Sequence, residues 1–347
     1  MRKRIPLLAA AALAALAGAR GLGAGWFDRE PLTDMVGPYK GFAGRLYPGS
    51  NQMPGDHAAA GAARAAAIVP RNTSGVPDPA GRYALLSIGM SNTTQEFCSG
   101  GGGLPCDAFT FMGQAAADPA VNKTTLALVN GALGGQSAAW WDEPADPNYN
   151  RVRDTVLIPQ GLSEAQVQIV WVKVANPGPT VALKGAQADA YRLLTQTGNI
   201  VRALKVRYPN VQQVFLSSRI YAGYATTTLN PEPYAYESGF AVKWAVGAQI
   251  EQMRSGRVDP RAGNLDYESV APWIAWGPYL WARGAQPRAD GLRWLPADFM
   301  PDGTHPSNSG RQKVGTLLLA FFKTSPQASC WFLAGQTCPS SAGAWGW

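Results

Sequence analysis

The sequence predicts a three-layer α/β/α fold in which a central parallel sheet is covered by helices on both faces. Four short, nearly continuous apolar runs are enriched in β-branched residues, which is typical of strands buried on both faces. Stretches with helical spacing alternate with these runs, and this alternation favours a parallel sheet. The chain has 347 residues and is 46% hydrophobic, so it is long enough to bury a full core.

The predicted strands and helices follow one another along the chain. The strands are apolar runs bounded by turn residues, at 83–88, 124–130, 167–174 and 211–218. Helices are predicted at 107–120, 184–208, 237–253 and 309–322. The clearest helical pattern is in the second of these, where apolar side chains recur at helical spacing at Tyr191, Leu194, Val201 and Leu204. An Ala-rich stretch at 57–69 is also compatible with a helix.

The first residues, 1–19, have the pattern of a secretory signal peptide. A basic start at 2–4 precedes a short apolar run and an Ala-Gly-Ala site for cleavage. The alternative is an uncleaved N-terminal anchor. We predict a loop-rich extension at 20–81, one α/β domain at 82–323, and a C-terminal loop and tail at 324–347. The signal peptide predicts a secreted or periplasmic protein.

The charge distribution gives no sign of a nucleic-acid partner. The net charge of +7 falls to +4 once the three basic residues of the signal peptide are removed, because 27 basic residues then face 23 acidic ones. Lysines and arginines are scattered and form no basic run. No later segment reaches about 18 uncharged apolar residues, so no integral membrane segment is expected after cleavage.

Four cysteines fall into two local pairs, Cys98 with Cys106 and Cys330 with Cys338. An exported chain sits in an oxidising compartment, where an even number of cysteines favours disulfides. Each bond would close a short loop and stabilise the fold by roughly 2–3 kcal/mol. A metal site is the alternative, but the spacing is wide and the chain has only 2 histidines.

Residues that follow the predicted strands carry the candidate chemistry. Ligands of open parallel sheets bind outside the carboxyl ends of the strands. Ser91 follows the first apolar run, Gly134 and Gly135 follow the second, and Asn176 follows the third. These positions are therefore expected to meet at one edge of the sheet.

The last loop, at 301–315, supplies Asp302 and His305, three residues apart. A carboxylate at this spacing can reach the imidazole ring, fix its tautomer and stabilise the imidazolium that forms when histidine takes a proton. The alternative is an incidental histidine in the turn that starts a helix. The other histidine, His57, lies in the Ala-rich stretch and is interpreted as a structural or surface residue.

The segment at 272–294 is unusual because it contains four tryptophans. One interpretation is a long loop whose aromatic side chains cap the core. The other is a wall of a substrate cleft, since tryptophan combines an apolar face with a polar edge that suits sugar rings. On the second interpretation, the substrate-binding candidates are Asn92, Trp140, Trp141 and Trp276.

Four motifs in this order resemble those of the SGNH (GDSL-type) hydrolase superfamily. They read GMSN at 89–92, NGALGGQS at 130–137, VKVANPGP at 172–179 and DGTHP at 302–306, and the resemblance covers about residues 82–323. It implies the flavodoxin-like fold of that superfamily. The chain is most similar to the sialate O-acetylesterase-like carbohydrate esterases. It departs from the superfamily pattern at Met90, Asn92, Ala175 and Pro177, which leaves the branch open.

The resemblance also implies roles for individual residues. Ser91 would be the nucleophile, His305 its general base and Asp302 the residue that orients His305. The oxyanion would be held by the backbone N–H groups of Ser91 and Gly135 and by the side-chain amide of Asn176. The sequence contains no metal-ligand cluster with plausible spacing, so no metal and no cofactor are expected.

The sequence therefore predicts a secreted serine esterase, a carboxylic ester hydrolase of the Ser-His-Asp type that works through an acyl-enzyme. The expected partner is a small-molecule or carbohydrate ester, with O-acetyl groups on carbohydrate preferred. The alternatives are an esterase for lipid or aryl esters and a catalytically inactive protein of the same fold that binds carbohydrate.

Overall fold

The computed structural model describes residues 29–99 and 104–339. The predicted signal peptide at 1–19 and the last eight residues of the predicted tail lie outside the described residues. Within them, no helix is long and apolar enough to cross a membrane.

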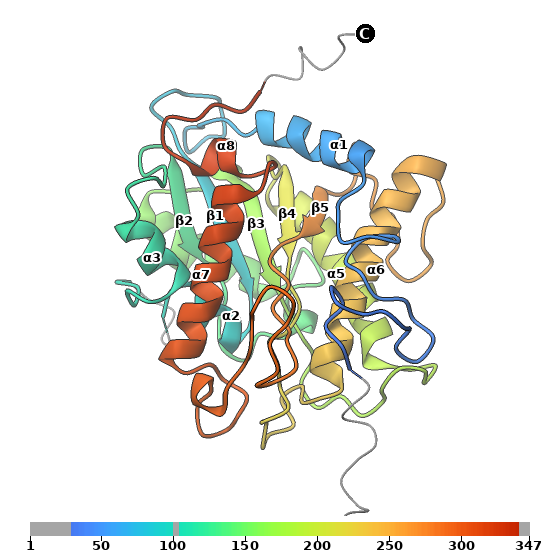
Figure 1. Cartoon of the computed structure of the whole chain (residues 1–347). Helices are drawn as coiled ribbons and strands as arrows, with labels where there is room; N and C mark the ends of the chain where they lie inside the picture. Colours follow the sequence, from blue (N-terminus) through green and yellow to red (C-terminus); the bar gives the residue numbers. More distant parts are fainter. Residues whose placement is uncertain (1–28, 100–103, 340–347) are drawn as a thin grey trace, which may run out of the picture.

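A five-stranded parallel sheet forms the centre of the molecule (Figure 1). Its strands lie in the order β2-β1-β3-β4-β5, which is the flavodoxin-like order. The predicted fold class, a parallel sheet between two layers of helices, is confirmed. The strands are β1 (Tyr83–Gly89), β2 (Leu126–Asn130), β3 (Val167–Lys173), β4 (Gln213–Leu216) and β5 (Trp273–Trp276).

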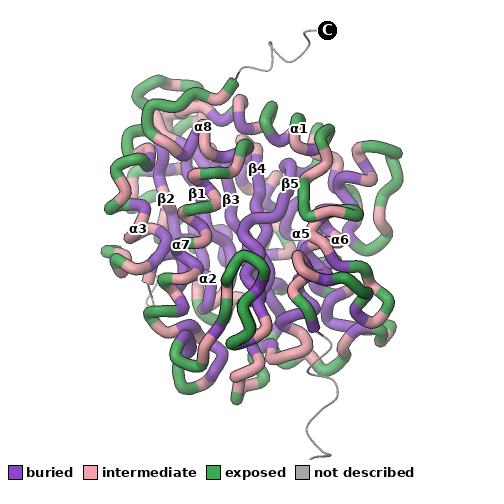
Figure 2. Tube along the Cα trace, viewed as in Figure 1, coloured by how far each residue is buried: buried purple, intermediate pink, exposed green. Residues whose placement is uncertain are grey.

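Both faces of the sheet are buried, as the nearly continuous apolar runs predict. Every residue of β1 and β3 is buried (Figure 2). Side chains alternate between the faces, so Leu86 and Ile88 enter one apolar cluster while Tyr83 and Leu85 enter the other. This pattern requires helices on each side of the sheet.

Helices supply the two outer layers. The cluster on one face includes side chains of α4 (Pro147–Arg151), α5 (Asp189–Arg207) and α6 (Tyr234–Ser255). On the opposite face, α7 lies in front of the sheet in Figure 1, and the cluster includes side chains of several shorter helices. The helices of this second face are α1 (Gly55–Ala66), α2 (Ser91–Phe97), α3 (Phe111–Ala117), α7 (Asn308–Thr324) and α8 (Ser329–Phe332).

Residues 29–81 contribute buried side chains to the same core. Leu32, Tyr39 and Tyr47 are among the buried residues of the α5–α6 face. Helix α1 packs so tightly on β5 that a Cβ atom at Gly61 would lie 2.4 Å from the indole of Trp273. The predicted extension is thus packed into the core over its described part, and the predicted boundary at residue 82 stays a prediction.

The tryptophan-rich segment at 272–294 differs from its prediction as a loop. Residues Trp273–Trp276 form the edge strand β5, which pairs with β4. The remaining two tryptophans, Trp281 and Trp294, are buried in the core, as the core-capping interpretation expects. The strand was missed because it is only four residues long and lies between Pro272 and Gly277.

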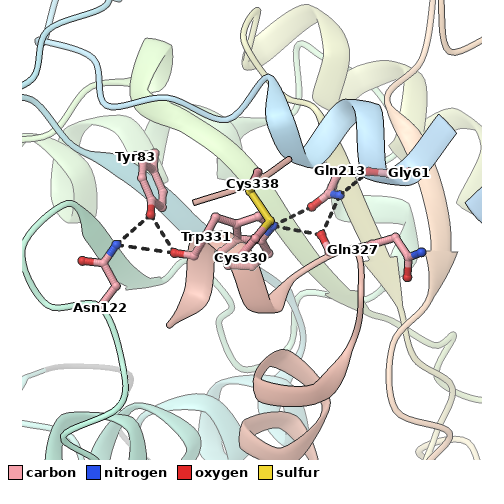
Figure 3. Close-up of a disulfide and its surroundings, with 8 residues drawn as sticks. All are labelled: Gly61, Tyr83, Asn122, Gln213, Gln327, Cys330, Trp331 and Cys338. Carbon is pink, nitrogen blue, oxygen red and sulfur yellow. Dashed lines mark hydrogen bonds between the residues drawn. A yellow bond between two sulfur atoms is a disulfide. The ribbon is translucent and has the colours of Figure 1, made fainter. Parts of the chain in front are cut away.

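The C-terminal segment closes the amino end of the sheet (Figure 3). The indole N–H of Trp331 in α8 donates to Gln213, the first residue of β4, and the Trp331 carbonyl accepts from Tyr83, the first residue of β1. Gln213 in turn donates to the carbonyl of Gly61 in α1. These contacts therefore link α8, α1 and the first residues of β1 and β4 at this end of the sheet.

Both predicted disulfides are present. Cys98 is bonded to Cys106 and Cys330 to Cys338, with a sequence separation of 8 in each case. Figure 3 shows the second bond beside α8. The alternative metal interpretation of these cysteines is wrong.

Candidate active site

A cavity of about 330 Å³ lies at the carboxyl edge of the sheet, where the loops after β1, β2, β3 and β4 meet the loop before α7. The strand order reverses between β1 and β3, and open α/β sheets bind ligands at such a point. The lining residues are Met90, Ser91, Asn92, Gly135, Ser137, Ala175, Asn176, Pro177, Arg219, Leu229, Asn230, Thr304 and His305.

Ser91 is the first residue of α2, and a tight strand-to-helix turn places it there. The turn needs glycine at position 89, because a Cβ atom would come within 2.3 Å of both the Lys173 carbonyl and the Thr93 hydroxyl. The same Thr93 hydroxyl donates to the Lys173 carbonyl, which fixes α2 against the end of β3. The strand therefore ends with its serine held at the sheet edge.

Two hydrogen bonds link Ser91, His305 and Asp302 in series. The Ser91 hydroxyl lies 2.8 Å from Nε2 of His305, and Nδ1 of His305 lies 2.5 Å from Oδ2 of Asp302. The arrangement joins side chains that are 214 positions apart in the sequence. With Nδ1 protonated and facing the carboxylate, Nε2 is free to accept the serine proton.

The carboxylate of Asp302 is held by several donors. Its Oδ1 accepts hydrogen bonds from the backbone N–H groups of Thr304, at 2.9 Å, and of His305, at 3.0 Å. Burial alone would raise the pKa of Asp302, but the hydrogen bonds from the His305 ring and from these two N–H groups lower it below its ordinary value. The group is therefore an ionised acceptor for the imidazole.

Gly303 shapes the loop between the carboxylate and the imidazole. Its φ of 62° lies in the left-handed region, and a Cβ atom would come within 1.9 Å of the Tyr224 carbonyl. The loop is fastened on its other side, because the side-chain amide of Asn92 donates to the Thr304 carbonyl at 3.0 Å. Asn92, predicted to bind substrate, thus lines the cavity and also anchors the loop that carries His305.

The glycine pair after β2 approaches Ser91 from the other side. A Cβ atom at Gly134 would lie 3.8 Å from Cβ of Ser91. Gly135 has a φ of 79°, lines the cavity and has open space where a side chain would stand. Its backbone N–H donates to none of the described residues. The position predicted for an oxyanion donor is therefore next to the serine and unobstructed.

Asn176 lines the cavity, but its amide is turned differently from the prediction. Both amide hydrogens are engaged, because Nδ2 donates to Asp189 at 3.1 Å and to Gln196 at 2.9 Å, two residues of α5. Its Oδ1 is buried and accepts from none of the described residues. In this arrangement the side-chain amide has no hydrogen left for an oxyanion. Sequence reasoning missed the competing acceptors because they lie on a helix that starts 13 residues later.

The tryptophans predicted to bind substrate are not among the residues that line this cavity. Trp141 is completely buried in the core, and Trp276 is buried with its indole N–H donating to the Leu46 carbonyl. Trp140 is 49% exposed. The structure thus brings together Ser91, Gly135 and His305 but leaves these three aromatic side chains elsewhere.

Arg219 and Asn230 line the cavity but were not among the predicted site residues. Arg219 comes three residues after the end of β4. The rule that selected Ser91, Gly135 and Asn176 would have found it, because it too follows a predicted strand. Asn230 lies on a loop with no such signal, and its amide donates to the Asn176 backbone carbonyl at 3.1 Å.

A buried ion pair lies behind the site. Lys173 at the end of β3 and Glu96 in α2 form a salt bridge with no solvent exposure of either side chain. Burial lowers the pKa of Lys173 to about 8, against the opposing effect of Glu96. The pair accounts for Glu96, which follows Ser91 closely in sequence, as a structural partner of the strand.

Among the described residues, no group of three or more His, Cys, Asp or Glu side chains is arranged to hold a metal ion. The second histidine, His57, is buried and its Nε2 lies 2.9 Å from the Ile274 carbonyl, away from the cavity.

No family model matches the sequence, and no curated protein matches it. Several solved structures are similar to this chain, and three of them are described here. The extracellular lipase of Streptomyces rimosus is 14% identical over 70% of this chain and 99% of the lipase, with a TM-score of 0.33. A carbohydrate esterase family 2 enzyme of Corynascus thermopiles (Myceliophthora fergusii) is 13% identical over 72% of this chain and 68% of its own, with a TM-score of 0.38.

A family two carbohydrate esterase of Clostridium thermocellum, solved with cellohexaose, is 16% identical over 72% of this chain and 65% of its own, with a TM-score of 0.35. The chain is thus similar at low identity to a lipase and two carbohydrate esterases, and its chemistry has to follow from the contacts of Ser91, Asp302 and His305 themselves.

Proposed function

We propose that the protein is a serine esterase that hydrolyses carboxylic esters through an acyl-enzyme. Ser91 is the nucleophile, His305 the general base, and Asp302 orients His305. The observation that carries the proposal is the pair of hydrogen bonds, 2.8 Å and 2.5 Å, that joins these three side chains beside a cavity. The four motifs that resemble the SGNH superfamily support the same assignment.

In the first half of the reaction, Nε2 of His305 takes the Ser91 proton while Oγ attacks the ester carbonyl carbon. A serine hydroxyl is a weak nucleophile at neutral pH and needs such a base. The imidazolium that forms is stabilised by the ionised Asp302. It then donates its proton to the alcohol as the carbon–oxygen bond of the ester breaks.

In the second half, water attacks the acyl-enzyme and His305 again accepts the proton. Both steps place a negative charge on the former carbonyl oxygen. The backbone N–H groups of Ser91 and Gly135 are the proposed donors for this oxyanion, and one such donor typically lowers the barrier by about 3–4 kcal/mol. The side-chain amide of Asn176 is not among the proposed oxyanion donors, because Asp189 and Gln196 accept its hydrogens.

Small esters are the proposed substrates. The cavity of about 330 Å³ is at the lower end of the range for small-molecule sites, which favours a short acyl group. The tryptophans predicted to bind a sugar do not line the cavity, so the resemblance alone supports a carbohydrate ester. Two disulfides support an exported protein, because such bonds persist in oxidising compartments.

The test uses acetyl and butyryl esters of p-nitrophenol with the purified protein and two serine variants. We expect Ser91→Ala to lower kcat by at least about 100-fold, because the nucleophile is lost. The matched control is Ser74→Ala, a serine in an exposed turn, which should retain full activity.

A second readout does not depend on choosing the right ester. A fluorophosphonate should add one covalent group to the wild type, and peptide mapping should locate it on Ser91. Equal turnover by the wild type and Ser91→Ala, or labelling that persists in Ser91→Ala, would contradict the proposal.

A further inference from the structure

Arg219 forms part of the cavity wall, and its guanidinium forms no salt bridge in the described part of the chain. The residue is 1% exposed, and its side-chain atoms Nε and Nη2 are buried without a hydrogen-bond acceptor among the described residues. Its backbone is fixed, because its N–H donates to the Ser238 hydroxyl at 3.1 Å. Arg219 thus lines the same cavity as Ser91 and His305.

An unpaired buried guanidinium is unusual because arginine stays protonated and the charge is costly to bury without a partner. The three carboxylates whose charges act on Arg219 are those of Glu96, Glu232 and Asp302. Glu96 is paired with Lys173, Glu232 accepts from the indole of Trp281, and Asp302 accepts from His305. None of them lies within salt-bridge distance of Arg219 in the described part of the chain.

We infer that Arg219 is a specificity residue that binds a carboxylate group of the substrate. This inference rests on the proposed esterase function and narrows its substrate class to small esters that carry one carboxylate. A guanidinium donates charge-assisted hydrogen bonds to a carboxylate, which pairs its charge.

The rest of the lining favours a monoanion of modest size. Arg219 is the only arginine or lysine among the described lining residues, which favours a ligand with a single carboxylate. Met90, Ala175 and Leu229 give the wall an apolar part against which a short carbon chain packs. The carboxylate can belong to the acyl group or to the alcohol, and the test separates these two sources.

The test compares two acids with their neutral amides of the same shape. Monomethyl succinate carries its carboxylate on the acyl side, and its control is methyl succinamate. For the alcohol side, 3-acetoxypropanoate is compared with 3-acetoxypropanamide. We expect the wild type to prefer one acid over its amide by at least about tenfold in kcat/KM, because hydrogen bonds to a charged group are worth this much or more.

Two variants assign the preference to the guanidinium. Arg219→Met should abolish the preference for the acid, because it should lower kcat/KM on the acid at least about tenfold more than kcat/KM on the amide. Arg219→Lys should keep part of the preference. The matched control Arg257→Met removes an exposed arginine of similar charge and should change neither ratio. A wild type without a preference, or an Arg219→Met protein that loses both activities equally, would overturn the inference.

A binding measurement separates this inference from the esterase proposal. Calorimetric titration of the Ser91→Ala protein with the four esters needs no turnover. Tighter binding of one acid than of its amide, lost in Ser91→Ala/Arg219→Met, supports the carboxylate site even if no ester is hydrolysed. Hydrolysis without any binding preference leaves the esterase proposal intact and refutes the carboxylate site.

Discussion

The contacts of single residues explain why the loop before α7 has the sequence Asp-Gly-Thr-His. Asp302 accepts from the ring and backbone of His305, Gly303 takes a left-handed φ against the Tyr224 carbonyl, and the Thr304 carbonyl accepts from Asn92. Each position therefore has its own physical requirement. The loop is a rigid support for the imidazole and does not depend on a helix or strand for its shape.

The state of Asp302 leads to a prediction about pH. Its pKa is lowered in the folded protein, so the stabilisation that it contributes is complete above its unfolded value of about 3.9 and is lost as the pH falls through the lower folded value. Between about pH 4 and pH 8 the carboxylate stays ionised. We expect the acid side of the log kcat/KM profile to have a limiting slope no greater than one, because Asp302 takes up no proton in this range.

The measurement is a pH–rate profile of an ester substrate with the wild type and with Asp302→Asn. The variant should lose roughly 10²–10⁴-fold in kcat at every pH, because an amide holds the ring in the wrong tautomer. A limiting slope of two in the wild type would show that the carboxylate titrates in this range and would contradict the assignment.

At the scale of elements, the sequence predicts the long, strongly patterned parts best. The predicted helix at 309–322 is α7, Asn308–Thr324, and the predicted helix at 237–253 is α6, Tyr234–Ser255. The predicted helix at 184–208 begins five residues too early, because α5 starts only at Asp189. Periodicity identifies a helix but does not locate the turn that starts it.

Short elements cannot be predicted from their own residues, because contacts with residues distant in the sequence stabilise them. The four-residue β5 exists through pairing with β4 and packing against α1, neither of which is visible in its own residues. The site follows the same rule. Positions at strand ends could be predicted. The occupied amide of Asn176 could not, because its acceptors lie in α5, and neither could the lack of an acceptor for Nε and Nη2 of Arg219.

The effects of removing each of the two disulfides on stability and activity can be compared directly. Both close loops of the same length, so replacing either pair by alanine should lower the free energy of unfolding by roughly 2–3 kcal/mol. Cys98 caps the C-terminal end of α2, the helix that begins with Ser91. We therefore expect Cys98→Ala/Cys106→Ala to lower kcat/KM at least about threefold and Cys330→Ala/Cys338→Ala to leave it unchanged.

Urea denaturation and initial rates on one ester measure both quantities in the two double variants. Equal loss of activity in the two proteins would show that α2 does not need its C-terminal tether to hold Ser91.

At the scale of the whole molecule, the two ends of the sheet differ in what surrounds them. The cavity lies at the carboxyl ends of the strands, while α1 and α8 meet the first residues of β1 and β4 at the amino ends. The buried clusters on both faces connect the two ends (Figure 2). The residues that line the cavity are thus different from the residues of α1 and α8 that pack at the amino ends.

This separation predicts a stability variant that leaves the chemistry unchanged. Trp331→Phe removes the indole donor to Gln213 and to the Gln327 carbonyl and leaves a buried acceptor unpaired. We expect the free energy of unfolding to fall by about 1–3 kcal/mol with kcat unchanged. Trp140→Phe, at a half-exposed site, is the control and should change stability by less than about 0.5 kcal/mol. A fall in kcat for Trp331→Phe would show that the two ends are coupled.

The hydrogen bond between Ser91 and His305 spans 214 positions of the chain. The serine leaves the ribosome long before the imidazole is synthesised, so a nascent chain cannot assemble the pair until the loop before α7 emerges. The order of synthesis therefore delays the proposed activity until most of the chain has been made.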